Sequence, residues 1–303
     1  MTGEKIRLDR LLLAHEPGAG VGRRGLHALF VAGRVRVNGL RAPKGTFVRA
    51  GDTVTVTQLS QEPLASTTPT LTIVHADEDL VAIDKPPALP TTVGRTPGPS
   101  VAAALMAAYP EMASLGDVHH AGLVHRLDTG TSGLLVAARS SEAYTRLRTA
   151  FLAKAVAKDY LAVVTGRLAS PEVVDAPLAR HRRSRGRMVV ARGNVKTWPA
   201  RTEVTPLAGD DDYTLVHLTM RTGVTHQLRV HLALLGHPIV GDLRYGSGAL
   251  PTAAVVTEPG WHFLHARRVR FDAPELPREL ATAFPSHWRP LFAARGWSTE
   301  LVD

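Results

Sequence analysis

An acidic residue with apolar neighbours on both sides is the first candidate for chemistry in this sequence. Asp128 comes directly after Leu127, and a turn-forming Thr-Gly-Thr-Ser-Gly segment separates it from the apolar pair Leu134 and Leu135. A carboxylate in such surroundings is costly unless a partner stabilises its charge, so this placement is typical of a functional acid. Taken alone, the pattern also fits a structural aspartate held by hydrogen bonds.

The same segment reads Asp-Thr-Gly-Thr-Ser, which is also the signature of aspartic proteases. Those enzymes need two carboxylates that share a proton, and the chain has a single Asp-Thr-Gly triplet, at Asp128. A homodimer could supply the second carboxylate, but protomers of that kind are much shorter. The protease interpretation is therefore disfavoured.

Histidine clusters suggest a metal site as a second alternative. The chain has 14 histidines, among them His119, His120 and His125, and the pair His226 and His231. Residues five apart do not lie above one another on a helix as ligands four apart do. Hydrogen-bonding histidines are the better interpretation, and we expect neither a metal nor a cofactor.

The charge of the chain indicates a polyanionic partner. Its 36 Lys and Arg residues against 27 Asp and Glu residues give a net charge of +9. Residues 1–60 hold ten basic and four acidic residues, and the segment from Ala176 to Thr202 holds eight basic residues and no acidic one. Two separate basic segments suit an extended polyanion such as RNA, although basic surfaces can also be merely solvated.

The absence of cysteine limits the chemistry, and the lack of an export signal or a membrane span bears on location. The absence of cysteine excludes disulfides, cysteine zinc sites and thiol nucleophiles. No apolar run approaches the roughly 18 residues of a membrane span, and the first apolar stretch is too short and too charged for a secretory signal. We therefore expect a cytoplasmic protein without a membrane partner.

Turn signals define a small unit in residues 1–60. A helical pattern begins at Leu8, a second helix is predicted over Arg24–Ala32, and strands are predicted over 34–37 and 53–56. Asn38-Gly39 is a strong hairpin signal because both residues tolerate positive φ, and Gly51-Asp52 marks a second turn. A small α/β unit follows from this pattern.

This unit resembles the S4 RNA-binding domain. The resemblance rests on the pattern G-x-V-x-V-N-G from Gly33 to Gly39 and on the later Gly-Asp turn, and it departs in the Gly- and Pro-rich insertion after His15. A small α/β cap with a surface hairpin is the alternative. The resemblance implies RNA binding, in which phosphate contacts would come from Arg23, Arg24, Arg34, Arg36 and Arg41.

The rest of the chain is predicted to form one larger domain. Residues 61–70 have two prolines and few large apolar residues, which is typical of a linker, and no comparable break follows in residues 71–303. Strands are predicted over 71–75, 80–83, 160–164 and 215–220, and helices over 100–108, 141–154 and 226–235. We expect an α+β domain with a mixed, largely antiparallel sheet core and flanking helices.

The segment around Asp128 resembles the H-R-L-D-x-x-T-S-G-L-L motif of the RluA-type RNA pseudouridine synthases of the RluA/RsuA superfamily. Further segments match motifs of that family in the family's order, namely 77–86, 158–162, 221–231, 236–242 and 263–266. The resemblance covers roughly residues 71–275. Four positions depart from it, since Asp84 stands where Asn is usual, Val224 where Arg is usual, and Thr129-Gly130 where a charged pair is usual.

The resemblance implies a reaction that needs neither metal nor cofactor. Uridine becomes pseudouridine when the N1–C1′ bond breaks, the uracil rotates, and C5 joins C1′, with no redox change. One ionised carboxylate suffices, either as nucleophile at the sugar or as base at C2′. The family pattern gives this role to Asp128, the compensating guanidinium to Arg229, and stacking on the uracil to Tyr160.

Contacts with the rest of the RNA are also implied. Because a stacked uridine must be flipped out, Arg126 is predicted to fill the gap that it leaves, and Leu264 to form an apolar wall of the pocket. Thr131, His226 and Gln227 are expected to contact the substrate, and Arg182, Arg183 and Arg185 to contact phosphates. Ribosomal RNA of the large subunit is the expected partner, with transfer RNA as the second candidate and no obligate protein partner.

A non-catalytic RNA-binding or assembly protein of the S4 type is the remaining alternative. The presence of Asp128, Tyr160 and Arg229 together argues against it, because binding alone needs no buried carboxylate.

Overall fold

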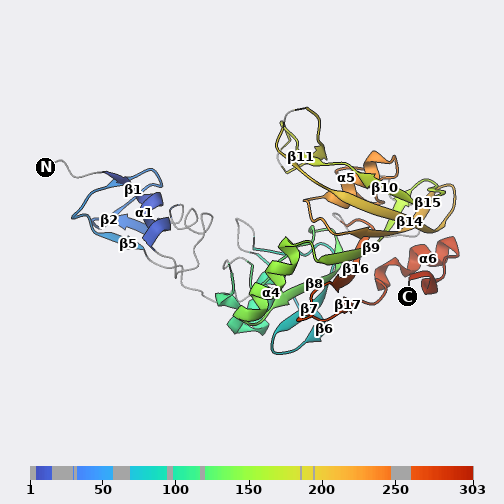
Figure 1. The fold of residues 1–303 in the computed structure, drawn as a ribbon, viewed down its shortest axis with the longest axis horizontal. Helices are drawn as coiled ribbons and strands as arrows, with labels where there is room; N and C mark the ends of the chain where they lie inside the picture. Colours follow the sequence, from blue (N-terminus) through green and yellow to red (C-terminus); the bar gives the residue numbers. More distant parts are fainter. Residues whose placement is uncertain are drawn as a thin grey trace.

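The computed structural model describes residues 5–15, 30, 33–56, 69–93, 98–116, 120–184, 186–193, 195–246 and 261–302. Its element order begins with a small unit that contains short strands and the helix α1, and continues into a large sheet with helices around it (Figure 1). Among the described residues, no helix combines the length and the apolar composition needed to cross a lipid bilayer.

The small unit contains the strands and turns that its sequence predicts. Its elements are β1 (Ile6–Arg7), α1 (Leu8–His15), β2 (Val35–Val37), β3 (Leu40–Arg41), β4 (Phe47–Val48) and β5 (Val54–Val56). β3, β2 and β5 form one sheet, and β1 pairs with β4. Asn38 and Gly39 adopt φ values of 52° and 79° between β2 and β3, so the hairpin is confirmed. The helix predicted over Arg24–Ala32 lies outside the described residues, apart from Phe30.

A nine-stranded sheet forms the large domain, and its mixed, largely antiparallel character is confirmed (Figure 1). The strand order is β10-β14-β15-β9-β16-β8-β7-β6, and β17 also pairs with β16. Their bounds are β6 Thr72–Ala76, β7 Leu80–Lys85, β8 Ser132–Ala138, β9 Val156–Thr165, β10 Glu172–Asp175, β14 Arg201–Gly209, β15 Tyr213–Met220, β16 Leu264–Phe271 and β17 Glu279–Ala281. The β8–β16 pair is parallel, and every other pair of this sheet is antiparallel.

Apolar side chains cover both faces of the sheet. Along β7, Val81 and Ile83 belong to one core cluster, whereas Leu80 and Ala82 belong to another on the opposite face. This explains the nearly continuous apolar runs of the central strands, because a strand buried on both faces does not alternate with polar residues. The Asp128 segment leads directly into one of these buried strands, β8.

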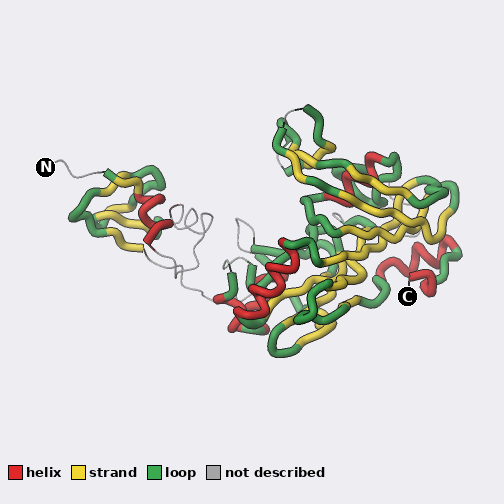
Figure 2. Tube along the Cα trace, viewed as in Figure 1, coloured by secondary structure: helices red, strands yellow, loops and turns green. Residues whose placement is uncertain are grey.

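Helices flank the sheet, as Figure 2 shows. They are α3 (Val101–Ala108), α4 (Ser141–Leu152), α5 (Gln227–Leu234) and α6 (Arg289–Arg295), with 3-10 turns at Pro110–Ser114, Ser286–Trp288 and Thr299–Val302. The hydroxyls of Ser100 and Ser140 each accept a backbone N–H three residues ahead, at 3.1 Å, and so begin α3 and α4. The predicted helices over 100–108, 141–154 and 226–235 are therefore confirmed within two residues at each end.

A glycine permits the close approach of β8 and β16. Gly133 has φ of 107°, and a Cβ atom placed on it would lie 2.2 Å from the backbone oxygen of Ala266. The two residues are Cα partners in the parallel pair. No side chain larger than hydrogen fits there, which explains the glycine at the start of this strand.

Part of the basic segment from Ala176 to Thr202 folds into a separate three-stranded sheet. β11 (Leu178–Arg180) pairs with β12 (Met188–Val190) and β13 (Thr197–Trp198), and this arm projects from the body of the domain (Figure 1). Its base is anchored, since Leu178 and Met188 pack with Val230 of α5.

Candidate active site

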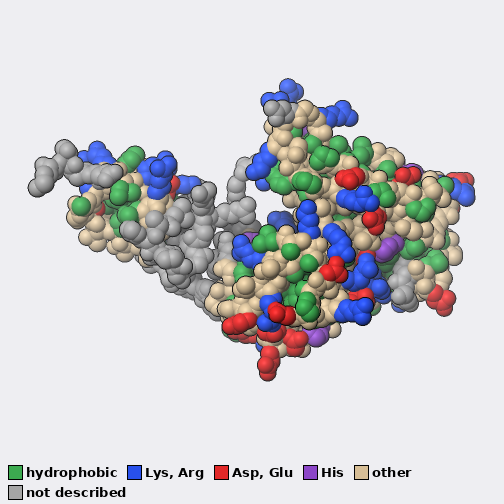
Figure 3. Space-filling view, in the orientation of Figure 1, with side chains coloured by type: hydrophobic (Ala, Val, Ile, Leu, Met, Phe, Trp, Pro, Cys, Tyr) green, Lys and Arg blue, Asp and Glu red, His purple; other side chains and the backbone are tan. Residues whose placement is uncertain are grey.

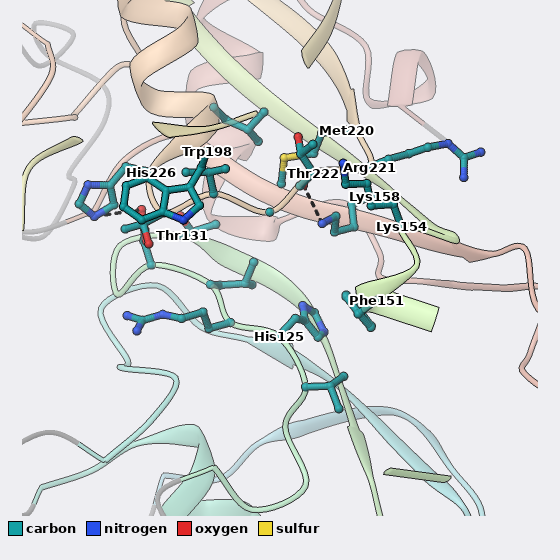
Figure 4. A pocket seen from close by; sticks show the side chains of 18 of the residues that line it. His125, Thr131, Phe151, Lys154, Lys158, Trp198, Met220, Arg221, Thr222 and His226 are labelled. Atoms are coloured by element: carbon teal, nitrogen blue, oxygen red, sulfur yellow. Dashed lines mark hydrogen bonds and ion pairs between the residues drawn. The ribbon is translucent and has the colours of Figure 1, made fainter. Parts of the chain in front are cut away.

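A pocket of about 940 Å³ lies where the segment from Leu123 to Thr131 meets β9, the start of β16 and the segment from Met220 to Arg229 (Figure 4). Asp128, Tyr160, Arg229 and Leu264 all line it. Residues more than 100 positions apart in the chain are thus brought to one site by the order of the sheet strands.

Asp128 lies in the turn that precedes β8. The backbone N–H of Thr131 donates to the backbone oxygen of Asp128 at 3.1 Å, which closes the turn. Its side chain remains 19% exposed, so a ligand in the pocket can reach it. Arg229 Nη1 donates to Asp128 Oδ2 at 2.9 Å, and His226 Nε2 lies 3.7 Å from the same oxygen.

Arg229 is held by a second acid, Asp242, to which the sequence patterns gave no role. Its Nε and Nη2 atoms donate to Oδ2 and Oδ1 of Asp242 at 2.7 and 2.8 Å, in the bidentate geometry that fixes a guanidinium plane. The Asp242 side chain is fully buried. Burial opposes its ionisation, but the hydrogen bonds and charge of Arg229 outweigh this and lower the pKa of Asp242. Burial likewise opposes the charge of Arg229, whose pKa is nevertheless raised by Asp242 and Asp128.

A signal for Asp242 was present in the sequence. It is an acid that follows the segment Gly236–Gly241, close to the apolar residues Ile239 and Val240, just as Asp128 follows an apolar residue. Its Oδ1 also accepts the backbone N–H groups of Arg244 and Tyr245, at 2.9 and 3.2 Å. Asp242 therefore organises a loop as well as the guanidinium.

Tyr160 and Leu264 belong to the apolar part of the pocket. Tyr160 lies on β9 with 5% exposure, and Leu264 begins the neighbouring strand β16 with 4% exposure. Burial, followed by the negative charge of Asp128, raises the pKa of Tyr160, so its hydroxyl stays protonated. A flat aromatic face next to an aliphatic side chain suits a planar base.

His226 is held beside Asp128 by Tyr245. It precedes α5 with φ of 57°, and its Nδ1 lies 2.7 Å from the Tyr245 hydroxyl oxygen. That oxygen already accepts the backbone N–H of Met188 at 2.8 Å, so its own hydrogen is available to His226 Nδ1. Burial lowers the pKa of His226. A neutral imidazole that accepts at Nδ1 carries its proton on Nε2, facing Asp128.

Lys85 stabilises the turn that contains Asp128 by hydrogen bonds to backbone oxygens. Its side chain is fully buried, and Nζ donates to the backbone oxygens of Pro86, Leu89 and Thr129 at 2.8, 2.8 and 3.1 Å. Burial lowers the pKa of Lys85 to about 7, against the attraction of Asp128 and Asp84. Because Thr129 follows Asp128 directly, Lys85 helps to fix the position of the acid.

The remaining predicted contacts divide into two groups. Arg126, Thr131 and His226 line the pocket together with Leu264, although the Thr131 hydroxyl is already within 2.8 Å of His262 Nε2. Gln227 lies behind it.

Gln227 is buried, does not line the pocket, and donates to the backbone oxygen of Arg201 and to Thr202 Oγ1 at 3.0 and 3.1 Å. The reason is helical geometry: side chains two positions apart, such as Gln227 and Arg229, point about 200° apart around a helix axis. Gln227 therefore secures α5 to β14 while Arg229 faces the pocket.

Comparisons with known proteins identify the family. Residues 79–234 match the family model described as RNA pseudouridylate synthase. The chain is 35% identical over 277 residues to an uncharacterized RNA pseudouridine synthase of Mycobacterium bovis, with 88% of each chain covered. It is also 35% identical over 286 residues to the ribosomal large subunit pseudouridine synthase D of Vibrio parahaemolyticus, with 90% of this chain and 85% of that protein covered.

The chain belongs to the RNA pseudouridylate synthase family. It is an RNA pseudouridine synthase of the RluA type, and thus an isomerase that acts on RNA. Its fold resembles the solved structure of human RNA pseudouridylate synthase domain containing 1, with a TM-score of 0.59 and 27% identity over 73% of this chain and 86% of that one.

The residues that suggested a protease or a metal site have different partners in this synthase. The groups that pair with Asp128 within the described part of the chain are Arg229 and His226, not a second carboxylate that could share a proton as in a protease. His231, from the second histidine pair, places Nδ1 and Nε2 against Thr202 Oγ1 and the backbone oxygen of Ala176, at 2.9 and 3.0 Å. Neither nitrogen of His231 is left for a metal.

The predicted RNA-binding arginines of the synthase lie in two places. Arg34 and Arg36 are exposed on the small unit, and Arg182 and Arg183 are exposed between β11 and β12 of the arm. Arg23, Arg24 and Arg185 lie outside the described residues. Figure 3 shows Lys and Arg side chains around the hollow between α4 and the arm, on the face that contains the pocket.

Proposed function

We propose that this synthase isomerises uridines in large-subunit ribosomal RNA, with Asp128 as the carboxylate that acts on the sugar. The observation that carries the catalytic assignment is the pairing of Asp128 with Arg229 at 2.9 Å in a pocket that Tyr160 also lines. The printed name of the Vibrio relative, a ribosomal large subunit synthase, supports the substrate class. Ribosomal RNA as substrate also supports a cytoplasmic location.

The geometry favours one oxygen of Asp128 for the reaction. The hydrogen bond from Arg229 goes to Oδ2, and His226 faces the same atom. Oδ1 is therefore the oxygen best placed to act. As a nucleophile it would bond to C1′ while the N1–C1′ bond breaks and uracil leaves with the electron pair. As a base it would instead remove the proton at C2′ while that bond breaks.

Both routes end in the same product. On the nucleophilic route C5 of the rotated uracil bonds to C1′ while the Asp128–C1′ bond breaks and releases the carboxylate; on the base route C5 bonds to C1′ while C2′ regains its proton. The hydrogen on C5 is then lost to solvent, and N1 gains a proton. Tyr160 would stack on the uracil and keep it in the pocket during this rotation, with Leu264 as the opposing apolar wall. Arg229 would balance the carboxylate charge before and after the bond exchange.

Arg126 would fill the place that the flipped nucleotide leaves in the RNA. It is exposed at the edge of the pocket, two residues before Asp128. Extrusion of a base costs a few kcal/mol, and a cationic side chain in the vacated position would offset part of this. Arg182 and Arg183 on the arm, together with Arg185, which lies outside the described residues, would hold neighbouring phosphates. The S4-like unit would add a second contact region.

The loss of hydrogen from C5 gives a direct experiment. Purified protein is incubated with large-subunit ribosomal RNA transcribed with tritium at C5 of uridine, and with transfer RNA labelled in the same way. We expect tritium release from the ribosomal RNA. Release from transfer RNA alone would show that ribosomal RNA is not the substrate. Release from neither RNA would exclude both classes of RNA as substrates.

The role of the small unit is tested by the salt dependence of binding. The logarithm of RNA affinity falls linearly with the logarithm of salt concentration, with a slope set by the number of phosphates contacted. Deletion of residues 1–60 should make this slope shallower while activity on a short RNA is retained. An unchanged slope would remove the S4-like unit from RNA binding.

A further inference from the structure

A buried lysine at the other end of the pocket has no role in the mechanism above. Lys158 lies on β9 with 7% exposure and lines the pocket. Its Nζ donates to the backbone oxygen of Thr222 at 2.8 Å and lies 5.8 Å from the centre of the Phe151 ring. Figure 4 shows its side chain directed at Thr222, with Phe151 and His125 nearby.

The charge of Lys158 is not balanced by any acid in the described part of the chain, where its ammonium forms no ion pair. The next residue, Asp159, faces away and interacts with Arg270, Thr219 and His217. An ammonium offers three donors, and here one acceptor is supplied, so a buried charge and two donors are left for a ligand.

The side chains near Lys158 add positive charge, and the one acid that lines the pocket, Asp128, makes no contact with Lys158 in the described part of the chain. Lys154 and Arg148 are exposed on the pocket wall, and Arg221 lines it while it pairs with Asp272 outside it. His125 is neutral, because burial and then the charge of Lys158 lower its pKa to about 3. Burial lowers the pKa of Lys158 itself to about 8, as expected for a cation that lacks its anion.

The distance from Tyr160 identifies the part of the RNA concerned. Residues two apart on a strand point to the same face, about 7 Å apart, which is the scale of one nucleotide step. Tyr160 is the residue expected to stack on the extruded uracil. An anion at Lys158 would then be the phosphodiester next to the flipped uridine.

We propose that Lys158, with Lys154 and Arg148 on the wall above it, forms a subsite for the backbone phosphate adjacent to the extruded uridine. This inference rests on the proposed function, since the ligand is the RNA substrate of the same pocket. A phosphate bound there supplies the missing counter-charge and fixes the nucleotide relative to Asp128. The subsite reads the backbone and not the base, so it contributes affinity without sequence preference.

In a purely structural role, Lys158 would only hold the backbone oxygen of Thr222. A variant that keeps a donor for this oxygen would then bind RNA with the wild-type salt dependence. Lys158→Gln keeps a donor for the Thr222 oxygen but removes the charge, whereas Lys158→Met removes both. Arg278→Met serves as a matched control, because it removes an exposed charge outside the pocket.

The test measures binding of each full-length variant to a labelled RNA hairpin with an all-uridine loop, at several salt concentrations. Conversion of the loop uridines leaves every phosphate in place, so it does not change the slope. We expect both Lys158 variants to bind about tenfold more weakly at low salt. The slope of log affinity against log salt should be shallower by about one for both variants, and unchanged in Arg278→Met.

Two outcomes would overturn the subsite. One is a wild-type slope in Lys158→Gln, and the other is an equal loss of slope in Arg278→Met, which would indicate overall charge and not a local contact. If Lys158→Met does not fold, Lys158→Gln decides alone. The slope reports binding and not turnover, so failure of tritium release by the wild-type protein is a separate result that concerns the proposed function.

Discussion

Asp242 accepts two hydrogen bonds from the guanidinium of Arg229, while the remaining Nη1 atom of that group donates to Asp128. One guanidinium therefore links a fully buried acid to a partly exposed one. Asp242 has no access to the pocket, whereas Asp128 does. The buried Asp242 orients Arg229, and Arg229 in turn orients Asp128.

The Asp242–Arg229 link predicts a catalytic defect at a residue that does not touch substrate. Asp242→Asn leaves one acceptor oxygen for the two donor atoms of Arg229, Nε and Nη2. The guanidinium is then free to shift toward Asp128. A displacement of about 1 Å can cost on the order of 100-fold in rate. We expect kcat to fall about 10- to 100-fold with KM changed less than about threefold, in a tritium-release assay. Asp211→Asn, at a 93% exposed side chain, is the control, and a wild-type kcat in Asp242→Asn would contradict the link.

Lys85 predicts a combined loss of stability and activity. Lys85→Met preserves volume but leaves the backbone oxygens of Pro86, Leu89 and Thr129 without their donor. We expect a loss of about 2–4 kcal/mol in the free energy of unfolding, together with a lower kcat because the Asp128 turn loosens. Denaturant unfolding and tritium release measure the two effects. Arg278→Met, at an exposed position outside the pocket, should change neither. Unaltered stability in Lys85→Met would show that these contacts contribute little.

Gly133 predicts a purely steric effect. In Gly133→Ala the new Cβ would meet the backbone of Ala266 at 2.2 Å, in a backbone conformation with positive φ. Backbone cannot move aside as a flexible side chain can, so we expect a loss of about 3 kcal/mol or more. Gly98→Ala, where the added atom meets nothing within 4 Å, should change stability by less than about 1 kcal/mol. Similar melting temperatures for the two variants would refute the close approach of β8 and β16.

Replacement of Asp84 by Asn is predicted to raise the free energy of unfolding, by an amount that depends on pH. Burial raises the pKa of Asp84 to about 6, although the charge of Lys85 acts in the opposite direction. The folded chain then binds this proton more tightly than the unfolded chain, so the free energy of unfolding falls as pH rises from about 4 to about 6 and stays low above that range. Asp84→Asn removes the titration. It should add about 1–3 kcal/mol above about pH 6 and almost nothing near about pH 4.

The pH dependence is the decisive part of the Asp84 experiment. Denaturant unfolding at several pH values between about 4 and 8 gives the difference between the wild type and Asp84→Asn, and Asp211→Asn provides the flat reference. The account is contradicted if the difference in the free energy of unfolding does not grow between about pH 4 and about pH 6, or if Asp84→Asn is less stable than the wild type at neutral pH. Either result would show that the ionised carboxylate of Asp84 does not destabilise the fold.

Local features of the fold were predictable from the sequence. The Asn38-Gly39 hairpin depends on which residues accept positive φ, and the helices that begin after Ser100 and Ser140 depend on a side-chain cap. The predicted strand over 160–164 was too short, however, because β9 begins at Val156. Lys158 and Asp159 are polar in sequence, yet they are buried with their own partners.

The candidate site was predictable only where motifs contain it. Family motifs indicated Asp128, Tyr160 and Arg229, which lie in one pocket although Asp128 and Arg229 are 101 positions apart. Asp242 and Lys85 also lie within motif segments, but their importance depends on contacts across the tertiary structure. Gln227 was expected at the substrate and lies behind the pocket, since its helix directs it away from Arg229.

The measurement that tests the central claim most directly compares wild-type protein with Asp128→Asn in two assays, tritium release from ribosomal RNA and RNA binding. Asn keeps the size of the side chain but cannot act as a nucleophile or a base. We predict no detectable pseudouridine, with affinity within about tenfold, or about 1.4 kcal/mol, of the wild type. Full isomerisation by Asp128→Asn would show that another group performs the chemistry.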